Sequence, residues 1–197
     1  MKRPVLRAVV ALLLALSCAG CNLLGGEEEK EKGSREVGSQ DDANTVAMII
    51  RRQVTDPCEV YSPTTWNYEQ VEGYAGGYAV VHGSYTEDSG AYYDSSSESY
   101  NDVVMSYESY SSDEDFPAIT GSATMNGTLT TDSSFTRGNT YSGGWIIQGQ
   151  VTMEEGTAGD DVYDFKGEVT FAIRIVNFDY AGVIAVDGTE WDVTSDY

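Results

Sequence analysis

Histidine is almost absent from this sequence. His82 is the only one among 197 residues, so a metal site built from several imidazoles is excluded, and any serine or cysteine nucleophile would depend on this one base. The sequence contains no Gly-x-Ser-x-Gly motif, no phosphate-binding glycine loop and no EF-hand spacing. We therefore expect no enzymatic activity, no catalytic residue, no cofactor and no specific metal site.

Positive charge is also scarce. The basic residues after Pro57 are only Arg137, Lys166 and Arg174. All 32 acidic residues lie after Cys21, where only 8 basic residues accompany them, a net charge of −24. Such a chain repels phosphate backbones and anionic lipid headgroups, so nucleic-acid binding and docking on a membrane through basic residues are both disfavoured. Cations and basic partners stay open as ligands.

Three cysteines, Cys18, Cys21 and Cys58, are too few and too unevenly placed to imply a disulfide framework. Cys58 is predicted to be a buried or free thiol. The other two close a leader in which a basic segment, residues 1–7, precedes an apolar segment, residues 8–16, that is too short to span a bilayer. This pattern predicts an export signal.

Small residues stand directly before both cysteines of the leader, Ser17 before Cys18 and Gly20 before Cys21. This arrangement resembles the lipobox of bacterial lipoproteins, and the resemblance covers the leader only. It implies a signal peptide over residues 1–20 and lipidation of Cys18 or Cys21, with both cysteines left as candidates. The protein would then be anchored to a membrane of the bacterial cell envelope, the outer membrane in particular, with its domain in the periplasm or at the cell surface. The alternative is an ordinary secretory signal.

Residues 21–40 are charged, rich in glycine and serine, and without apolar periodicity, so we expect a disordered acidic tether. The next segment has helical periodicity, because apolar residues recur at intervals of three and four from Ala43 to Val54. Asp56 followed by Pro57 ends it. We predict one short helix over residues 42–54.

Short segments of alternating apolar and polar residues make up the remaining chain. Residues 165–175 are the clearest, and Asp187-Gly188 supplies a tight turn for a hairpin over residues 182–193. Other strands are predicted at residues 65–71, 78–86, 99–110, 119–131 and 140–153. Asn126-Gly127 either divides the 119–131 segment by a turn or lies within one long strand.

These segments predict a mainly β fold: about eight strands with short connections and one short N-terminal helix. We expect a single antiparallel β domain over residues 41–197, a meander forming a curved sheet or a barrel, with the helix at its mouth or on its face. An outer-membrane barrel is disfavoured, because acidic residues occur on nearly every strand.

Two further features suggest binding surfaces. Acidic residues cluster in three groups: Glu154, Glu155, Asp160, Asp161 and Asp164; Asp113, Glu114 and Asp115; and Asp187, Glu190 and Asp192. We interpret these as solvated loops in preference to calcium sites. Tyrosines concentrate in the first half of the sheet, at positions 74, 78, 85, 92, 93, 100, 107 and 110, with Tyr141 further on. Tyrosine suits strands structurally and also suits ligand stacking.

The candidate ligand surface is formed by Tyr78, His82, Tyr85 and Tyr107. The main hypothesis is a non-enzymatic, lipid-anchored envelope protein that binds a ligand or a partner, or has a structural role. An envelope protein, a glycan and a lipid are the candidate partners, and the oligomeric state is left open. Alternatives are a carrier of a lipid or another hydrophobic ligand in a β cavity, and a hydrolase that uses carboxylates.

Overall fold

The computed structural model describes residues 36–59, 62–89, 95–134, 137–154 and 163–195. The chain divides into two units, Met1–Gly33 and Ser34–Tyr197, and every described residue belongs to the second. The expected signal peptide, both candidate lipidation sites Cys18 and Cys21, and most of the expected tether lie outside the described residues.

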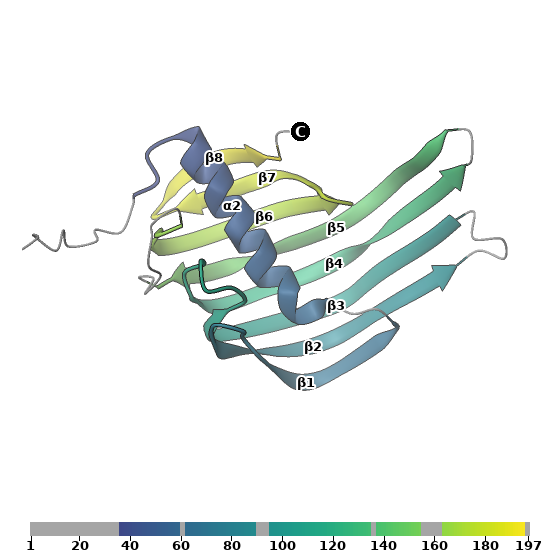
Figure 1. Ribbon diagram of the computed structural model, residues 1–197, viewed down its shortest axis with the longest axis horizontal. Coiled ribbons are helices and arrows are strands. Elements are labelled where there is room, and N and C mark those ends of the chain that lie inside the picture. The colour runs from purple at the N-terminus through teal and green to yellow at the C-terminus, as the bar shows by residue number, and fades with distance from the viewer. Residues whose placement is uncertain (1–35, 60–61, 90–94, 135–136, 155–162, 196–197) are drawn as a thin grey trace, which may run out of the picture. The chain divides into compact units, whose positions relative to one another are not determined.

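The described strands form one antiparallel sheet in which each strand pairs with the next one along the chain. They are β1 (Thr64–Glu72), β2 (Gly76–Ser89), β3 (Ser95–Ser111), β4 (Ile119–Ser134), β5 (Gly138–Met153), β6 (Gly167–Val176), β7 (Asp179–Val186) and β8 (Thr189–Thr194). The mainly β class and the antiparallel meander are confirmed. Of the two forms left open by the sequence, the structure has the curved sheet, because β1 and β8 are unpaired edges (Figure 1).

One helix, α2 (Gln40–Thr55), crosses one face of this sheet diagonally and continues into a short 3₁₀ helix, η1 (Asp56–Cys58) (Figure 1). It begins two residues earlier than predicted because Ser39 caps it. The Ser39 hydroxyl oxygen accepts a hydrogen bond from the Asp42 amide at 3.2 Å, and the Asp42 carboxylate accepts one from the Gly38 amide at 3.2 Å. The first bond satisfies a backbone donor that the first helical turn leaves without a partner, and the second ties the residue before the cap to the helix.

The core lies between α2 and the sheet. From the helix it takes the predicted apolar face, Ala43, Val46, Ala47, Ile50 and Val54, together with Ile49, all fully buried. The facing sheet residues are the apolar members of the alternating segments, including Val81, Met105, Met125, Ile147 and Ile173. Each such side chain contributes on the order of 1.5–3 kcal/mol by leaving water. Packing against this face is what holds α2 in place.

Two local features of the long strands depend on particular residues. In β3, a bulge between Tyr100 and Val103 holds Asp102 at a φ of 51°, and the Asn126 side chain accepts the Asp102 backbone N–H at 2.6 Å. In β5, a Cβ at Gly149 would lie only 2.3 Å from a backbone oxygen of β4, so this close approach requires glycine. Asn126 and Gly127 lie within one long strand, β4, and do not form a turn. The Asn126 side chain stabilises the bulge of the neighbouring strand, β3.

The two edges of the sheet differ in how they are protected. At β8, the Gln40 side chain donates to the Asp192 carbonyl at 2.6 Å, and the Asn44 side chain accepts from the Thr194 amide at 3.3 Å, so the first turns of α2 cover this edge. At β1, a bulge places Tyr68 at a φ of 57°. The side-chain hydrogen bonds at β8 and the bulge in β1 each interrupt the row of free backbone groups that would otherwise pair with another strand.

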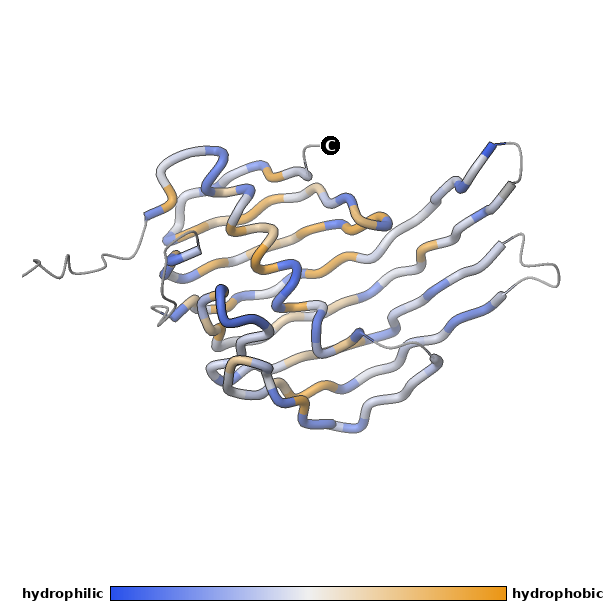
Figure 2. The backbone as a smooth tube through the Cα atoms, viewed as in Figure 1, coloured by the Kyte–Doolittle hydropathy of each residue, from blue (hydrophilic) through white to orange (hydrophobic). Residues whose placement is uncertain are grey.

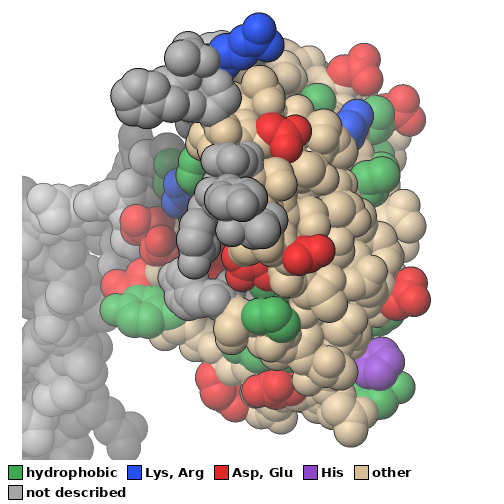
Figure 3. Space-filling view, turned by 90° about the vertical axis from the view of Figure 1, so that its right-hand side faces the viewer, with side chains coloured by type: hydrophobic (Ala, Val, Ile, Leu, Met, Phe, Trp, Pro, Cys, Tyr) green, Lys and Arg blue, Asp and Glu red, His purple; other side chains and the backbone are tan. Residues whose placement is uncertain are grey.

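Strands β2 to β5 are longer than β6 to β8 and extend well past the end of α2 (Figure 1). Figure 2 shows that the apolar residues concentrate under and beside the helix, whereas the extended ends are mainly hydrophilic. Seen from these ends, the surface has acidic and hydrophobic side chains dispersed among small polar residues and backbone (Figure 3). One face of the sheet is therefore covered over only part of its length.

Candidate functional site

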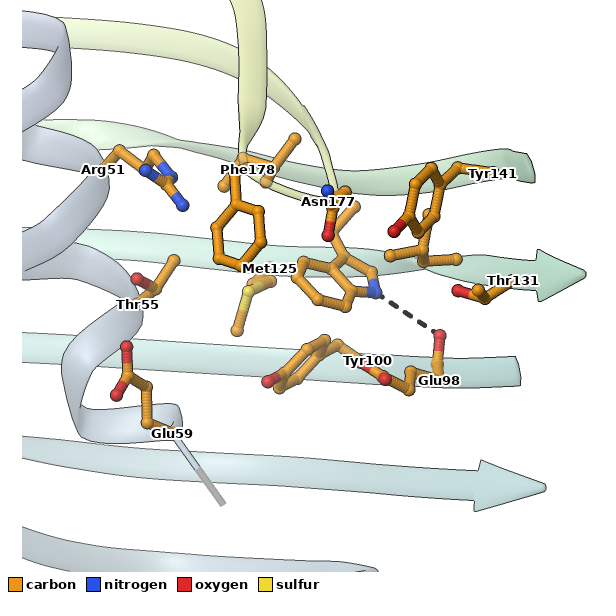
Figure 4. Close-up of a pocket in the computed structure, with 13 residues that line it drawn as sticks. Arg51, Thr55, Glu59, Glu98, Tyr100, Met125, Thr131, Tyr141, Asn177 and Phe178 are labelled. Atoms are coloured by element: carbon orange, nitrogen blue, oxygen red, sulfur yellow. Dashed lines mark hydrogen bonds between the residues drawn. The ribbon is translucent and has the colours of Figure 1, made fainter. Parts of the chain in front are cut away.

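A pocket of about 320 Å³ lies where this covered part ends (Figure 4). The last turns of α2 form one side, the turn between β6 and β7 forms another, and the extended ends of β3, β4 and β5 form the floor. Met125, Leu129 and Ile175 contribute apolar surface. This volume falls within the range of small-ligand sites, at its lower end.

Aromatic rings dominate the floor of the pocket. Tyr100 packs edge-to-face against Trp145, with ring centroids 5.1 Å apart at 87°, and also contacts Tyr85 at 5.0 Å. The Trp145 indole N–H donates to the Glu98 carbonyl at 3.3 Å, and the Tyr100 hydroxyl donates to the Cys58 carbonyl at 3.4 Å. Ring contacts and hydrogen bonds together hold these rings in one arrangement before any ligand arrives.

Two more rings stand at the mouth of the pocket and are open to solvent. Tyr141 projects from β5 with 40% of its surface exposed, and Phe178 projects from the β6–β7 turn with 72% exposed. Asn177 turns the chain there at a φ of 56°, a conformation that asparagine adopts more readily than most residues. Both exposed rings line the same pocket, so they offer apolar contact surface at its mouth.

Polar side chains complete the lining: Arg51, Thr55 and Glu59 on the helix side, Glu98 and Thr131 on the strands, and Asn177 at the turn. Burial raises the pKa of Glu98, and Glu87, its cross-strand neighbour on β2, raises it further. Burial also raises the pKa of Tyr85 to about 12, with Glu98 and Glu87 adding to the effect. The phenol of Tyr85 therefore keeps its proton at neutral pH, and carboxylates set the charge at this end of the pocket.

The structure does not bring together the four residues of the predicted ligand surface. Tyr107 is buried under α2, where its hydroxyl donates to the Val54 carbonyl at 3.1 Å. Tyr78 and His82 lie on the opposite face of the sheet, where Tyr78 donates to Glu108 and the His82 ring stacks on another ring. Only Tyr85 lies beside the pocket, through its contact with Tyr100.

Cys58 is a free thiol and fully buried, as the sequence predicted. Burial, and to a smaller degree Asp56, raises its pKa to about 12. A thiol that holds its proton so firmly is a poor nucleophile. His82 stacks on Tyr68, with ring centroids 4.6 Å apart, on the face of the sheet away from the helix. The structure therefore does not form a Cys58–His82 pair.

Several acidic residues of the predicted clusters have protein partners. The Asp187 carboxylate accepts the Glu168 amide at 2.9 Å, and the Asp113 carboxylate accepts the Asp115 amide at 3.1 Å. Glu155, Asp160 and Asp161 lie outside the described residues, as do Tyr92 and Tyr93. Within the ranges that the structure describes, no three His, Cys, Asp or Glu side chains gather closely enough to hold a metal ion. In those same ranges no helix is long and apolar enough to cross a membrane.

Sequence reasoning missed most of the pocket, including Trp145, Phe178 and Glu98. One usable signal was present: Tyr141 and Trp145 fall in the same alternation as the buried Ile147, so aromatic residues extend the apolar face of β5 beyond its aliphatic part. For β3 the bulge at Asp102 shifts the alternation and hides the same signal. Comparison of the chain with protein-family models, with curated proteins and with solved structures finds no match.

Proposed function

We propose that this protein is a non-enzymatic, lipid-anchored binding protein of the bacterial cell envelope, and that its aromatic pocket holds a segment of an uncharged glycan. The observation that carries the proposal is the fixed pair of rings, Tyr100 and Trp145, set between carboxylate, amide and hydroxyl side chains. Aromatic faces pack against the C–H faces of sugar rings, and the polar side chains around them supply hydrogen-bond partners for sugar hydroxyls.

The charge of the protein disfavours an anionic ligand. Acidic residues greatly outnumber basic ones, and Glu59 and Glu98 lie in the pocket itself. Phosphorylated, sulfated or uronic-acid glycans would be repelled by this surface. The hydrophobic-carrier alternative has less support, because the space between α2 and the sheet is filled by fully buried side chains such as Ile49 and Ile50.

Binding is tested with the two exposed rings, because their removal leaves the core intact. The full-length protein is screened against immobilised neutral glycans, and the affinity for a bound glycan is then measured by calorimetry. Tyr141→Ala and Phe178→Ala are each expected to weaken binding by about tenfold or more. Tyr74→Ala, which removes a tyrosine that is 80% exposed and outside the pocket, is the matched control. Equal affinities for all three variants and the unaltered protein would refute this site.

The lipid anchor rests on the sequence of the leader alone. Metabolic labelling with a radioactive fatty acid is expected to mark the unaltered protein. The label should be absent from one of the two variants Cys18→Ser and Cys21→Ser and present in the other. The variant that loses the label identifies the lipidated cysteine. Loss in neither variant, or no labelling of the unaltered protein, contradicts the anchor.

A second candidate function is hydrolysis of the same glycan by two carboxylates. Glu98 and Glu87 face each other on neighbouring strands, beside the aromatic floor, and the pKa of Glu98 is raised, as a general acid requires. Incubation of each bound glycan with the protein, followed by analysis of the products, distinguishes the two functions. Cleavage that disappears in Glu98→Gln favours hydrolysis, whereas intact glycan with retained binding favours the non-enzymatic function.

A further inference from the structure

A second groove adjoins the aromatic pocket. Its volume is about 370 Å³, and it lies over the C-terminal turn of α2 and the loop between β3 and β4. Arg52, Asp56, Ser112, Asp113 and Phe116 line this groove and take no part in the first pocket. Its lining is therefore more polar than the aromatic floor of the first pocket.

The two sites are continuous. Both are lined by Arg51, Thr55, Glu59 and Phe178, so the boundary between them passes over the end of α2 and beside the exposed Phe178 ring. A ligand confined to the aromatic pocket would leave the far side of these shared residues in water. A ligand long enough to continue past them would contact both sites without any change in the fold.

The second groove is also fixed in place. The Gln53 side chain accepts the Ser112 amide at 2.7 Å and donates to the Pro117 carbonyl at 2.7 Å, which ties the β3–β4 loop to α2. The Arg52 guanidinium lies 5.9 Å from the centre of the Phe116 ring, and that ring packs edge-on against Tyr163 at 5.5 Å. Groups held in this way lose little freedom when a ligand binds.

We infer that the ligand is a linear, uncharged oligosaccharide that occupies both grooves, with one part of the chain on the aromatic floor and the next part between Phe178 and the β3–β4 loop. This inference rests on the proposed function and adds the length of the ligand to it. The Ser112 and Asp113 side chains, with Arg52, are positioned to hydrogen-bond the hydroxyls of the second part.

The test measures affinity against chain length in the full-length protein by calorimetry. The probes are two uncharged series, β-1,4-linked glucose and β-1,4-linked N-acetylglucosamine, each from one to six units. In the series that binds, a chain long enough to fill both grooves is expected to bind about tenfold or more tightly than the shortest chain that binds. Ser112→Trp, which fills the second groove, should abolish this gain and leave the affinity of the shortest binding chain unchanged.

Ser106→Trp is the matched control, because Ser106 is exposed on the opposite face of the sheet. Ser112→Gln, a smaller obstruction, replaces Ser112→Trp if the tryptophan variant does not fold. Affinity that is independent of chain length, or a gain that survives obstruction of Ser112, overturns the inference while the aromatic site stands. Binding of no oligomer in either series overturns the proposed function together with it.

Discussion

In the covered part, strands β4 and β5 carry Ile119, Met125 and Ile147, which are buried in the same core cluster as the side chains of α2. Beyond the helix, the same face of the same two strands carries Thr131 and Tyr141, which are partly or largely exposed. The register of the two strands is unbroken from one part to the other. The difference therefore does not come from the backbone; it comes from where α2 ends.

The composition of the two parts follows from this boundary. On β4 and β5, the buried side chains of the covered part are aliphatic or methionine, which pack closely and lose no hydrogen bond when water is excluded. Beyond the helix, Trp145 and Tyr141 follow on the same face of β5, and such rings with polar edges tolerate water on one side and still offer a large contact face. The candidate site lies at the boundary, where a covered core becomes an open surface.

The largest expected effect contrasts two neighbouring residues of β5 on opposite faces of the sheet. Ile147 is fully buried and Ile146 is 48% exposed. Ile147→Ala is expected to lower the free energy of unfolding by about 2–5 kcal/mol, because it leaves a cavity. Ile146→Ala is expected to cost less than about 1 kcal/mol. Urea unfolding followed by circular dichroism measures both, and equal costs would show that α2 does not cover β5 as described.

A second comparison concerns two glutamines. Gln53 is fully buried and satisfies two backbone groups of the β3–β4 loop, whereas Gln148 is exposed on β5. Gln53→Leu leaves both of those groups without partners and is expected to lower the free energy of unfolding by about 2–3 kcal/mol. Gln148→Leu is expected to change it by less than about 0.5 kcal/mol. The same denaturation assay applies, and a neutral Gln53→Leu would contradict the role of this bridge.

Two tyrosines give a smaller contrast. The Tyr107 hydroxyl donates to the Val54 carbonyl in the core, while Tyr141 lies at the mouth of the pocket. Tyr107→Phe is expected to lower the free energy of unfolding by about 1 kcal/mol, the net contribution of one buried hydrogen bond. Tyr141→Phe should leave the free energy of unfolding unchanged within error. If Tyr141→Phe lowered the free energy of unfolding more than Tyr107→Phe, the assignment of covered and open regions would be wrong.

The smallest effect is a pH dependence. The folded state raises the pKa of Glu98, first through burial and then through Glu87, so the ionised carboxylate lowers stability once the pH exceeds the unfolded-state pKa. Glu98→Gln is therefore expected to raise the melting temperature slightly at pH 7, and this gain should vanish near pH 3.5, where both states are protonated.

The matched control for Glu98 is Glu114→Gln, an exposed carboxylate in the β3–β4 loop, which corrects for the loss of one negative charge. The gain attributed to Glu98 is the part that this control does not reproduce. A gain of the same size at both pH values would argue against a raised pKa as its origin.

Much of the fold could be predicted because the alternation of residues is regular where strands are covered on one face. The buried face of β6 and the Asp187-Gly188 turn, with φ values of 48° and 81°, match the sequence pattern. α2 starts two residues before the predicted position, because Ser39 caps it. Local patterns carry this information since each depends on neighbours in the sequence.

The candidate site was not predictable in the same way. Its residues come from α2, β3, β4, β5 and the β6–β7 turn, and no short segment contains more than a few of them. The sequence pattern around a strand tyrosine is the same whether the side chain is buried, as in Tyr107, or lies at a pocket, as in Tyr141. Choosing between these required knowing which part of each strand the helix covers.

By itself the sequence determined the class of the fold, the number and order of the strands and the face of α2 that is buried, because periodicity and turn residues act locally. It also determined the acidic character of the surface. Only the tertiary structure decided that the sheet stays open, where α2 ends upon it, and which rings meet beyond that end. Those features depend on contacts between residues far apart in the chain, whose energies no local pattern records.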